Sequence, residues 1–269
     1  GKRHHHRVHQ KFKERHHQRI HFSYKGRSGI VAKLLTTAYF PPVSYFAAIA
    51  EDMKGLVKVK GGDRKSILPS PLSSSVIYIE ACENYQKQSY RNRCHFYAAD
   101  GLQSLSFPII HDAGSHKHPI SEVRIDYSKP WVIQHQRAII SAYRTSAYFE
   151  YYQDELFEIL DSRPEKLIDL NTQILKFFID KTGLKADIRM TDEFRPDGYI
   201  VSSDGMEVKC EDLRESIHPK REDRLLKDLR LEKPYFQVFA EKHGFIPNLS
   251  IMDLLFNEGP DSIMYLKNL

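Results

Sequence analysis

The chain has 269 residues, of which 41% are hydrophobic and 28% charged, and its mean hydropathy is -0.51. This composition is typical of a folded globular protein and argues against a disordered one. No apolar run approaches the roughly 18 residues that are needed to span a bilayer, so we expect no transmembrane segment. The three cysteines are an odd number without C-x-x-C spacing, which favours a reducing compartment and argues against a structural zinc site. We therefore expect a cytoplasmic protein.

The positive charge of the chain is concentrated at its start. Residues 1–33 hold ten of the 40 Lys and Arg and one of the 35 Asp and Glu, so the other 236 residues hold 30 basic and 34 acidic side chains. Residues 1–29 carry seven of the 14 histidines and show no helical or alternating apolar pattern. They predict a basic, disordered extension, with a metal-binding histidine tract or a nucleic-acid arm as alternatives. The acidic remainder argues against a nucleic-acid partner except through this arm.

The first predicted element is a buried strand over 30–39, which the Phe-Pro-Pro at 40–42 ends because proline cannot donate to a strand ladder. A short helix with an apolar face is predicted over 43–50. Residues 53–75 are rich in Gly, Pro, Ser and Lys, which indicates a loop insertion. The next apolar run predicts a strand over 76–80.

More strands and then a series of helices are predicted further along. A hairpin is expected from 93–98 and 102–110, because Ala-Asp-Gly at 99–101 favours a tight turn. A short strand is expected over 122–127. Helical spacing of apolar residues occupies 131–143, 149–160, 165–181, 233–243 and 250–256. The order of elements predicts one α/β or α+β domain over 30–269. Its small mixed sheet comes mainly from the first half, its helices come mainly from the second, and its start is Rossmann-like.

The densest polar cluster of the sequence follows the strand predicted over 76–80. Ligands of open α/β sheets bind at the carboxyl ends of strands. The cluster supplies three basic side chains that suit a phosphate or carboxylate group and three side chains that can orient it by hydrogen bonds. The basic side chains are those of Lys87, Arg91 and Arg93, and the hydrogen-bonding side chains are those of Asn84, Tyr85 and Asn92. The alternative is a charged surface loop that binds no ligand.

Histidines elsewhere invite a chemical interpretation. His135 lies on the same predicted helical stripe as Trp131, so it is either a core histidine or an acid–base group lining a pocket. His95 follows Cys94, but neighbouring strand residues point to opposite faces, which favours a buried structural cysteine over a Cys–His pair. Residues 111–119 contain three histidines and are interpreted as a polar turn, with a metal site as the alternative. We predict no metal ligand.

Four separated blocks carry a resemblance to a known family. They are Ala38–Phe46, Val76–Glu80 with Arg91–Arg93, Trp131–Tyr143 with Ala147–Phe149, and Leu249–Phe256. In this order the blocks resemble the WbqC-like family, and the resemblance runs from about Leu34 to Leu255. The chain departs from the family at 36–38, where Thr-Thr-Ala replaces the His-Gln-Pro of many members. It departs again at 80–81, where Glu-Ala replaces an acidic pair. Any role of the replaced side chains cannot be carried over.

The resemblance implies an enzyme of bacterial surface-polysaccharide (O-antigen-like) biosynthesis, for which a glycine or other aminoacyl transfer onto a sugar has been proposed. We therefore expect a transferase whose partner is a nucleotide-linked or lipid-linked sugar. The resemblance identifies neither a cofactor nor an oligomeric state. In this hypothesis Lys87, Arg91 and Arg93 hold a phosphate, Glu80 or His135 is the general base, and Asn84, Tyr85, Asn92 and Trp131 contact the substrate.

Two alternatives stay open. One is a nucleotidyltransferase-like enzyme that holds phosphate at the turn over 39–45, where a helix N-terminus is predicted. The other is a non-catalytic binding module whose basic arm contacts RNA or an anionic membrane surface. Counterion release predicts that RNA binding by such a module falls steeply with salt and is lost without residues 1–33.

Overall fold

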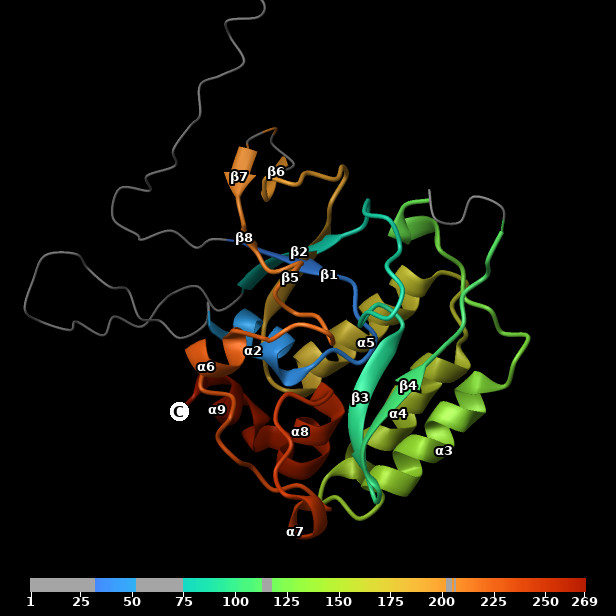
Figure 1. Cartoon of the computed structure of the whole chain (residues 1–269), viewed down its shortest axis with the longest axis vertical. Coiled ribbons are helices and arrows are strands. Elements are labelled where there is room, and N and C mark those ends of the chain that lie inside the picture. The colour runs from blue at the N-terminus through green and yellow to red at the C-terminus, as the bar shows by residue number, and fades with distance from the viewer. Residues whose placement is uncertain (1–31, 52–74, 113–117, 202–204, 206) are drawn as a thin grey trace, which may run out of the picture.

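The computed structural model describes residues 32–51, 75–112, 118–201, 205 and 207–269 (Figure 1). The extension expected at 1–29 lies outside these residues, as does the insertion expected at 53–75 apart from its last residue. The assignment of 30–269 to a single domain therefore stays a prediction. No helix in the described part of the chain is long and apolar enough to cross a membrane.

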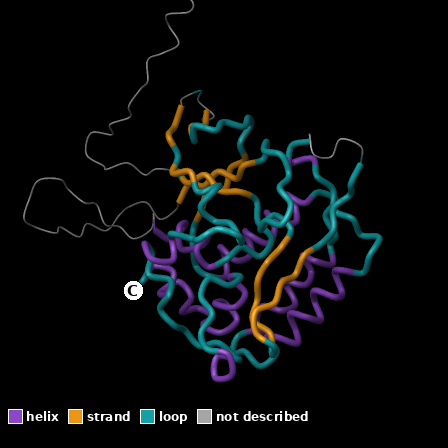
Figure 2. The backbone as a smooth tube through the Cα atoms, viewed as in Figure 1, coloured by secondary structure: helices purple, strands orange, loops and turns teal. Residues whose placement is uncertain are grey.

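A four-stranded parallel sheet lies at one end of the molecule (Figures 1 and 2). Its strands are β1 (Lys33–Thr36), β2 (Ser75–Glu80), β5 (Ala186–Met190) and β8 (Glu211–Asp212). Their order is β5–β2–β1–β8, and every pairing is parallel. The carboxyl ends of all four strands therefore meet at one edge of the sheet, where ligands of such sheets bind.

Two helices lie against one face of this sheet, α2 (Val43–Glu51) and α5 (Leu167–Lys181). Ile77 points to that face and joins both helices in the main hydrophobic core. Side chains alternate along a strand. Leu34 and Tyr78 accordingly belong to a separate, smaller cluster of buried residues. The helix-covered face thus anchors the sheet in the body of the protein.

A separate antiparallel hairpin stands beside the sheet, formed by β3 (Arg93–Ala98) and β4 (Gly101–Ser106). Its turn contains the predicted Asp-Gly pair, and Gly101 has φ 101°, a conformation that glycine adopts without a steric penalty. Cys94 lies opposite Leu105, and both side chains are buried in the main core. The hairpin therefore has one buried face, on which its position depends.

The remaining elements are η2 (Ile120–Glu122), α3 (Trp131–Tyr143), α4 (Phe149–Asp161), β6 (Tyr199–Val201), β7 (Glu207–Lys209), α6 (Leu225–Asp228), α7 (Ala240–His243), α8 (Ile251–Glu258), η3 (Gly259–Asp261) and α9 (Ser262–Lys267). Helix α8 is buried along most of its length, and α3 and α4 pack beside it and the hairpin. Gly259 ends α8 with φ 53°, and a Cβ atom there would lie 2.5 Å from the ring of Tyr148. That close approach requires glycine.

The expected fold class is confirmed, because the fold is mixed α/β and most helices lie in the second half. Its details differ from the expectation. Strands β5 and β8 come from the second half, and the hairpin is separate from the parallel sheet. Within the described residues, the strand expected over 30–39 is limited to Lys33–Thr36, and Phe40 adopts φ 42°, which no strand residue has.

Two expected elements are wrong. Residues 122–127 do not form a named strand, and Arg124 and Ile125 make only isolated bridges. The helix expected over 233–243 is reduced to Ala240–His243. Tyr235 and Gln237 instead donate hydrogen bonds to the buried Asp253, which holds their segment away from a helical path.

Candidate functional site

The carboxyl edge of the parallel sheet holds a buried network of charged side chains. Glu80, the last residue of β2, is 1% exposed. Its Oε1 accepts a hydrogen bond from Thr191 Oγ1 at 2.9 Å, and its Oε2 lies 2.9 Å from Nη1 of Arg214. Arg214 also donates to both carboxylate oxygens of Asp212, at 2.9 and 2.7 Å. Glu80 thus has an internal partner at each carboxylate oxygen.

A second buried ion pair follows β2. Arg91 donates to both carboxylate oxygens of Glu83, at 2.7 and 2.8 Å, and the two residues are only 3% and 7% exposed. Burial raises the pKa of Glu83, and the hydrogen bond and charge of Arg91 oppose that rise. Asn171 of α5 donates to the main-chain oxygen of Arg91 at 2.8 Å. The charge of Arg91 is therefore paired with that of Glu83 in the protein interior.

Arg93 differs from the other buried arginines. It begins β3, it is half-buried, and its Nε atom is buried without a hydrogen-bond partner. Four arginines of the described chain are buried or half-buried, and all except Arg93 have an acidic partner: Arg91, Arg195 and Arg214. An unsatisfied buried donor costs about 1–3 kcal/mol, so an anion that satisfied it would be bound favourably.

Tyr85 and His95 lie near the charge of Arg93, and Tyr90 contacts His95. We call the four residues the Arg93 cluster: Tyr85, Tyr90, Arg93 and His95. Burial raises the pKa of the Tyr85 hydroxyl, and the charges of Arg91 and Arg93 oppose that rise. Burial lowers the pKa of His95, and the charge of Arg93 lowers it further. The rings of Tyr90 and His95 meet edge to face, with centroids 5.7 Å apart. The cluster combines a free cation with aromatic and neutral polar groups.

The other expected binding residues of this loop have simpler surroundings. Asn84 and Lys87 are exposed, and the backbone of Asn84 forms an isolated bridge with Pro119. Asn92 is half-buried and donates to the main-chain oxygen of Phe107 at 2.7 Å, which fixes the entry into β3. Asn92 also lies beside the Tyr85 hydroxyl. The structure therefore brings Tyr85, Asn92 and Arg93 together.

Trp131 and His135 belong to an aromatic group on the side of the hairpin that packs against α3. His135 is 4% exposed, its Nδ1 lies 2.8 Å from the Tyr39 hydroxyl, and its Nε2 lies 3.1 Å from the main-chain oxygen of Ser106. Burial lowers the pKa of His135 to about 4. Trp131 stacks on Phe107, with ring centroids 4.9 Å apart. Both nitrogens of His135 thus have partners inside the protein.

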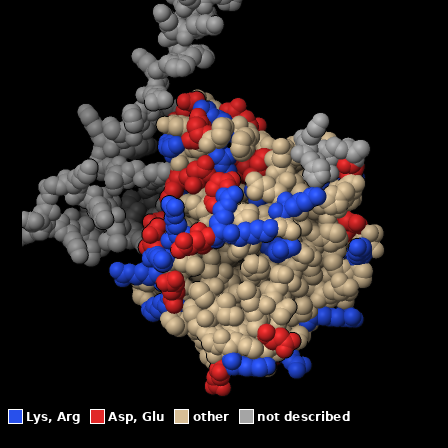
Figure 3. Space-filling view, viewed as in Figure 1, with Lys and Arg blue, Asp and Glu red and all other residues tan. Residues whose placement is uncertain are grey.

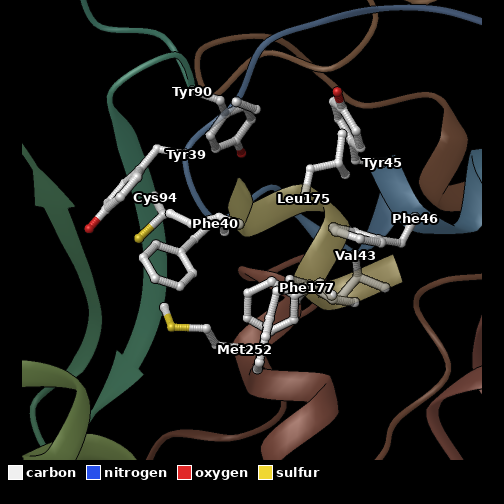
Figure 4. Packing of buried hydrophobic residues seen from close by; sticks show 14 of the residues in the cluster. Tyr39, Phe40, Val43, Tyr45, Phe46, Tyr90, Cys94, Leu175, Phe177 and Met252 are labelled. Carbon is white, nitrogen blue, oxygen red and sulfur yellow. The ribbon is translucent and has the colours of Figure 1, made fainter. Parts of the chain in front are cut away.

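The side chain of Arg93 projects from a different face of β3 than Cys94, which lies near this aromatic group. Arg93 and His95 lie two residues apart and share one face of β3, whereas Cys94 between them projects from the other face. Figure 4 shows Cys94 beside Tyr39, the residue whose hydroxyl contacts His135. His135 contacts the main-chain oxygen of Ser106, the residue that pairs with Arg93 in the hairpin, and within the described residues no contact joins His135 to Arg93 itself. The base roles expected of Glu80 and His135 stay predictions, and each needs an existing bond to break first.

The N-terminus of α2, where the nucleotidyltransferase alternative places a phosphate, is occupied by protein groups. The backbone N–H of Val43 donates to the oxygen of Leu249 at 2.9 Å, and that of Tyr45 donates to Pro42 at 3.0 Å. The N–H of Ser44 between them donates to Oδ1 of Asn248 at 2.8 Å. A phosphate at this position would have to displace these partners.

The histidine-rich segment is only partly visible, because 113–117 lies outside the described residues. In its described part, Asp112 pairs with Arg124 at 3.4 Å and His118 lies 3.5 Å from Glu122. These residues line a shallow pocket together with Ile109, Ile110 and Val123. Across the described ranges there is no group of three or more His, Cys, Asp or Glu side chains that could hold a metal ion.

Comparison with known proteins gives this geometry a family context. The sequence model of the WbqC-like protein family matches residues 72–207, half of the chain. The chain belongs to the WbqC-like protein family. This range of the WbqC-like chain contains β2, the Arg93 cluster and helices α3 to α5. Two of the four blocks that carry the resemblance, 38–46 and 249–256, lie outside it.

One relative among curated proteins has no described activity. The chain is 25% identical over 201 residues to the "Uncharacterized protein Rv1507c" of Mycobacterium tuberculosis (strain ATCC 25618 / H37Rv). The match covers 68% of this chain and 84% of that protein. No solved structure matches the chain.

Sequence reasoning missed two residues that the structure brings forward. His95 was considered only as a partner of Cys94, although its spacing of two from Arg93 in a predicted strand already places both on one face. Arg214 was not considered, because its link to Glu80 joins segments 134 residues apart. The sequence therefore contained a signal for His95, its spacing of two from Arg93, and no signal for Arg214.

Proposed function

We propose that this WbqC-like protein is a transferase that binds a nucleotide-linked or lipid-linked sugar through the Arg93 cluster. The observation that carries the proposal is the half-buried Arg93 guanidinium, whose Nε has no partner within the described residues. A guanidinium can donate two parallel hydrogen bonds to a phosphate group, and such bonds are stronger in a partly desolvated site. The chain belongs to the WbqC-like family, and the surface-polysaccharide association that the resemblance implies favours a sugar as the ligand.

The surface near β3 supports a ligand with one charged and one neutral part. Lys, Arg, Asp and Glu side chains gather in the upper half of the face seen in Figure 3, whereas few cover the area over β3 and α8. Sugar hydroxyls suit an uncharged polar surface, and a half-buried aromatic side chain such as Tyr85 combines an apolar ring with a hydrogen-bonding group. A sugar phosphate has both parts.

The other expected residues would then act in different ways. Tyr85 and Asn92 would orient the ligand beside Arg93, and the exposed Asn84 and Lys87 would lie at the solvent edge of the site. The buried ion pairs of Glu80 and Arg91 would hold the loop that carries the cluster. Trp131 and His135 would support the hairpin from its inner side. The transferred group, by the family resemblance, is glycine or another aminoacyl group.

A thermal-shift panel on the full chain tests this proposal. The panel contains UDP- and dTDP-sugars, ATP, CTP, coenzyme A thioesters and glycine, each with and without Mg²⁺. A ligand at about 100 times its dissociation constant stabilises the native state by about 2.7 kcal/mol. We expect stabilisation by one class of sugar nucleotide, and its loss in Arg93→Gln.

Arg137→Gln is the matched control, because Arg137 is an exposed arginine on α3. It should keep the ligand response of the wild type. A sugar-nucleotide response that Arg93→Gln keeps in full would place the ligand elsewhere. The absence of a response to every compound would favour the non-catalytic binding module.

A further inference from the structure

His95 is the histidine of the Arg93 cluster, and its position suits a role that the cluster otherwise lacks. Arg93 and His95 project from the same face of β3, two residues apart, which separates their backbones by about 7 Å along the strand. A ligand whose phosphate lies on Arg93 would therefore carry its sugar toward His95. We propose that His95 is the catalytic base that accepts the proton of the attacking sugar atom. This inference rests on the proposed function.

The side chain of His95 is free to act in this way. It is half-buried, and its ring nitrogens have no hydrogen-bond partner among the residues that the structure describes. The edge-to-face contact with Tyr90 orients the ring without using either nitrogen. Ser104, opposite His95 on β4, is exposed and leaves the face open. His135 lacks this freedom, because both of its nitrogens are already paired.

The protonation state of His95 also suits a base. Burial and then the charge of Arg93 lower the pKa of His95 below its ordinary value of 6.5, so the imidazole is neutral at pH 7. Arg93 is the charged group that acts on it, and Tyr90 and Ser104 are the uncharged groups that face it. A phosphate bound to Arg93 cancels that charge and raises the pKa of His95 toward the working pH, where a general base is most effective.

The step that His95 serves can be written with its atoms balanced. The amine of a bound amino sugar attacks the acyl carbon of an aminoacyl thioester or adenylate, the activated donor. A carbon–nitrogen bond forms, and the carbon–sulfur or carbon–oxygen bond to the leaving group breaks. The leaving group departs with the electron pair of that bond. His95 accepts the proton that the attacking nitrogen loses.

Histidine ring signals in NMR spectra of the full chain give a test that needs no transfer assay. The pKa of His95 is measured for the wild type and for Arg93→Gln, each with and without UDP, and His95→Gln assigns the signal. We expect UDP to raise the pKa of His95 in the wild type. We expect Arg93→Gln to raise it without UDP and to abolish the effect of UDP. Arg137→Gln and the signal of the exposed His111 are the controls.

A second measurement separates a base from a binding group. UDP should still stabilise His95→Gln against heat, whereas it should not stabilise Arg93→Gln. If UDP binds at Arg93 but the pKa of His95 responds neither to UDP nor to Arg93→Gln, the role of His95 is wrong and the proposed function stands. If neither UDP nor any sugar nucleotide of the panel changes the His95 signal or the melting temperature of the wild type, the anion site is wrong and both proposals fail.

Discussion

Two arginines that are close in the sequence have opposite uses. Arg91 makes two hydrogen bonds to Glu83 in the protein interior, whereas Arg93 has a buried Nε without a partner in the described structure. Breaking a buried ion pair by removing one partner costs about 3–5 kcal/mol, because the other charge is left uncompensated. Arg91→Gln should therefore destabilise the fold by an amount of this order, whereas Arg93→Gln, which breaks no ion pair among the described residues, should not.

His135 is predicted to stabilise the fold rather than to bind ligand. Its folded-state pKa of about 4 lies below the unfolded value of 6.5, so the unfolded state binds more protons between these values. The wild type should lose up to about 3 kcal/mol of stability as the pH falls from 6.5 to 4. His135→Asn should be less stable by about 1–3 kcal/mol at pH 7, because the Tyr39 hydroxyl loses a partner, and the difference should narrow on acidification.

Urea unfolding at several pH values measures both effects, and His111→Asn, at an exposed position, is the control. A stability difference that stays constant from pH 7 to 4 would contradict the burial of a neutral His135. A His135→Asn protein of wild-type stability that no longer responds to UDP would instead make His135 a ligand-binding residue.

At the scale of elements, one carboxylate of α8 ties the segment before α7 to α3 and α8. Asp253 of α8 is 1% exposed and accepts hydrogen bonds from the hydroxyls of Tyr143 and Tyr235, at 3.0 and 2.6 Å. Gln237 donates to it at 2.8 Å and also bonds both backbone groups of Ile246. This network explains why the segment before α7 does not form a helix although its apolar residues have helical spacing.

Asp253 should make the protein less stable as the pH rises. Burial raises the pKa of Asp253 to about 6 from 3.8, so its contribution is complete below pH 3.8 and is lost as the pH rises through 6. Asp253→Asn does not titrate and can still accept and donate hydrogen bonds in this network. The wild type should therefore lose up to about 3 kcal/mol relative to Asp253→Asn between pH 4 and pH 7.

Free energies of unfolding across this pH range provide the check. Asp154→Asn is the control, because Asp154 is an exposed aspartate of α4, and its pH profile should follow that of the wild type. Parallel profiles for the wild type and Asp253→Asn would mean that the pKa of Asp253 is the same in the folded and unfolded states, which contradicts the effect of its burial.

At the scale of the whole molecule, the sequence predicts long periodic elements and the order of the fold well. Helices α3, α4 and α5 have apolar stripes, and Asp-Gly marks the hairpin turn. Strands β5 to β8 have two to five residues and only a short alternating pattern, so they were missed.

The sequence predicted only part of the candidate site, because sequence patterns bring together residues that are close along the chain and not those that only the tertiary fold joins. Tyr85, Asn92 and Arg93 are close in the sequence, so local reasoning placed them together. The partners that Glu80 and His135 already have, Arg214 and Tyr39, lie 134 and 96 residues away from them along the chain. Only the tertiary fold shows that these side chains are already paired.

In the proposed function, Arg93 binds the anionic group of the substrate. The most direct measurement is the Nε–H signal of Arg93 in a proton–nitrogen NMR spectrum, identified by its absence in Arg93→Gln, during a titration with UDP. We expect a saturable shift of this signal as the buried Nε–H gains an acceptor, with no matching shift for Arg137. A protein that is stabilised by UDP while the Arg93 signal stays unchanged would contradict the claim.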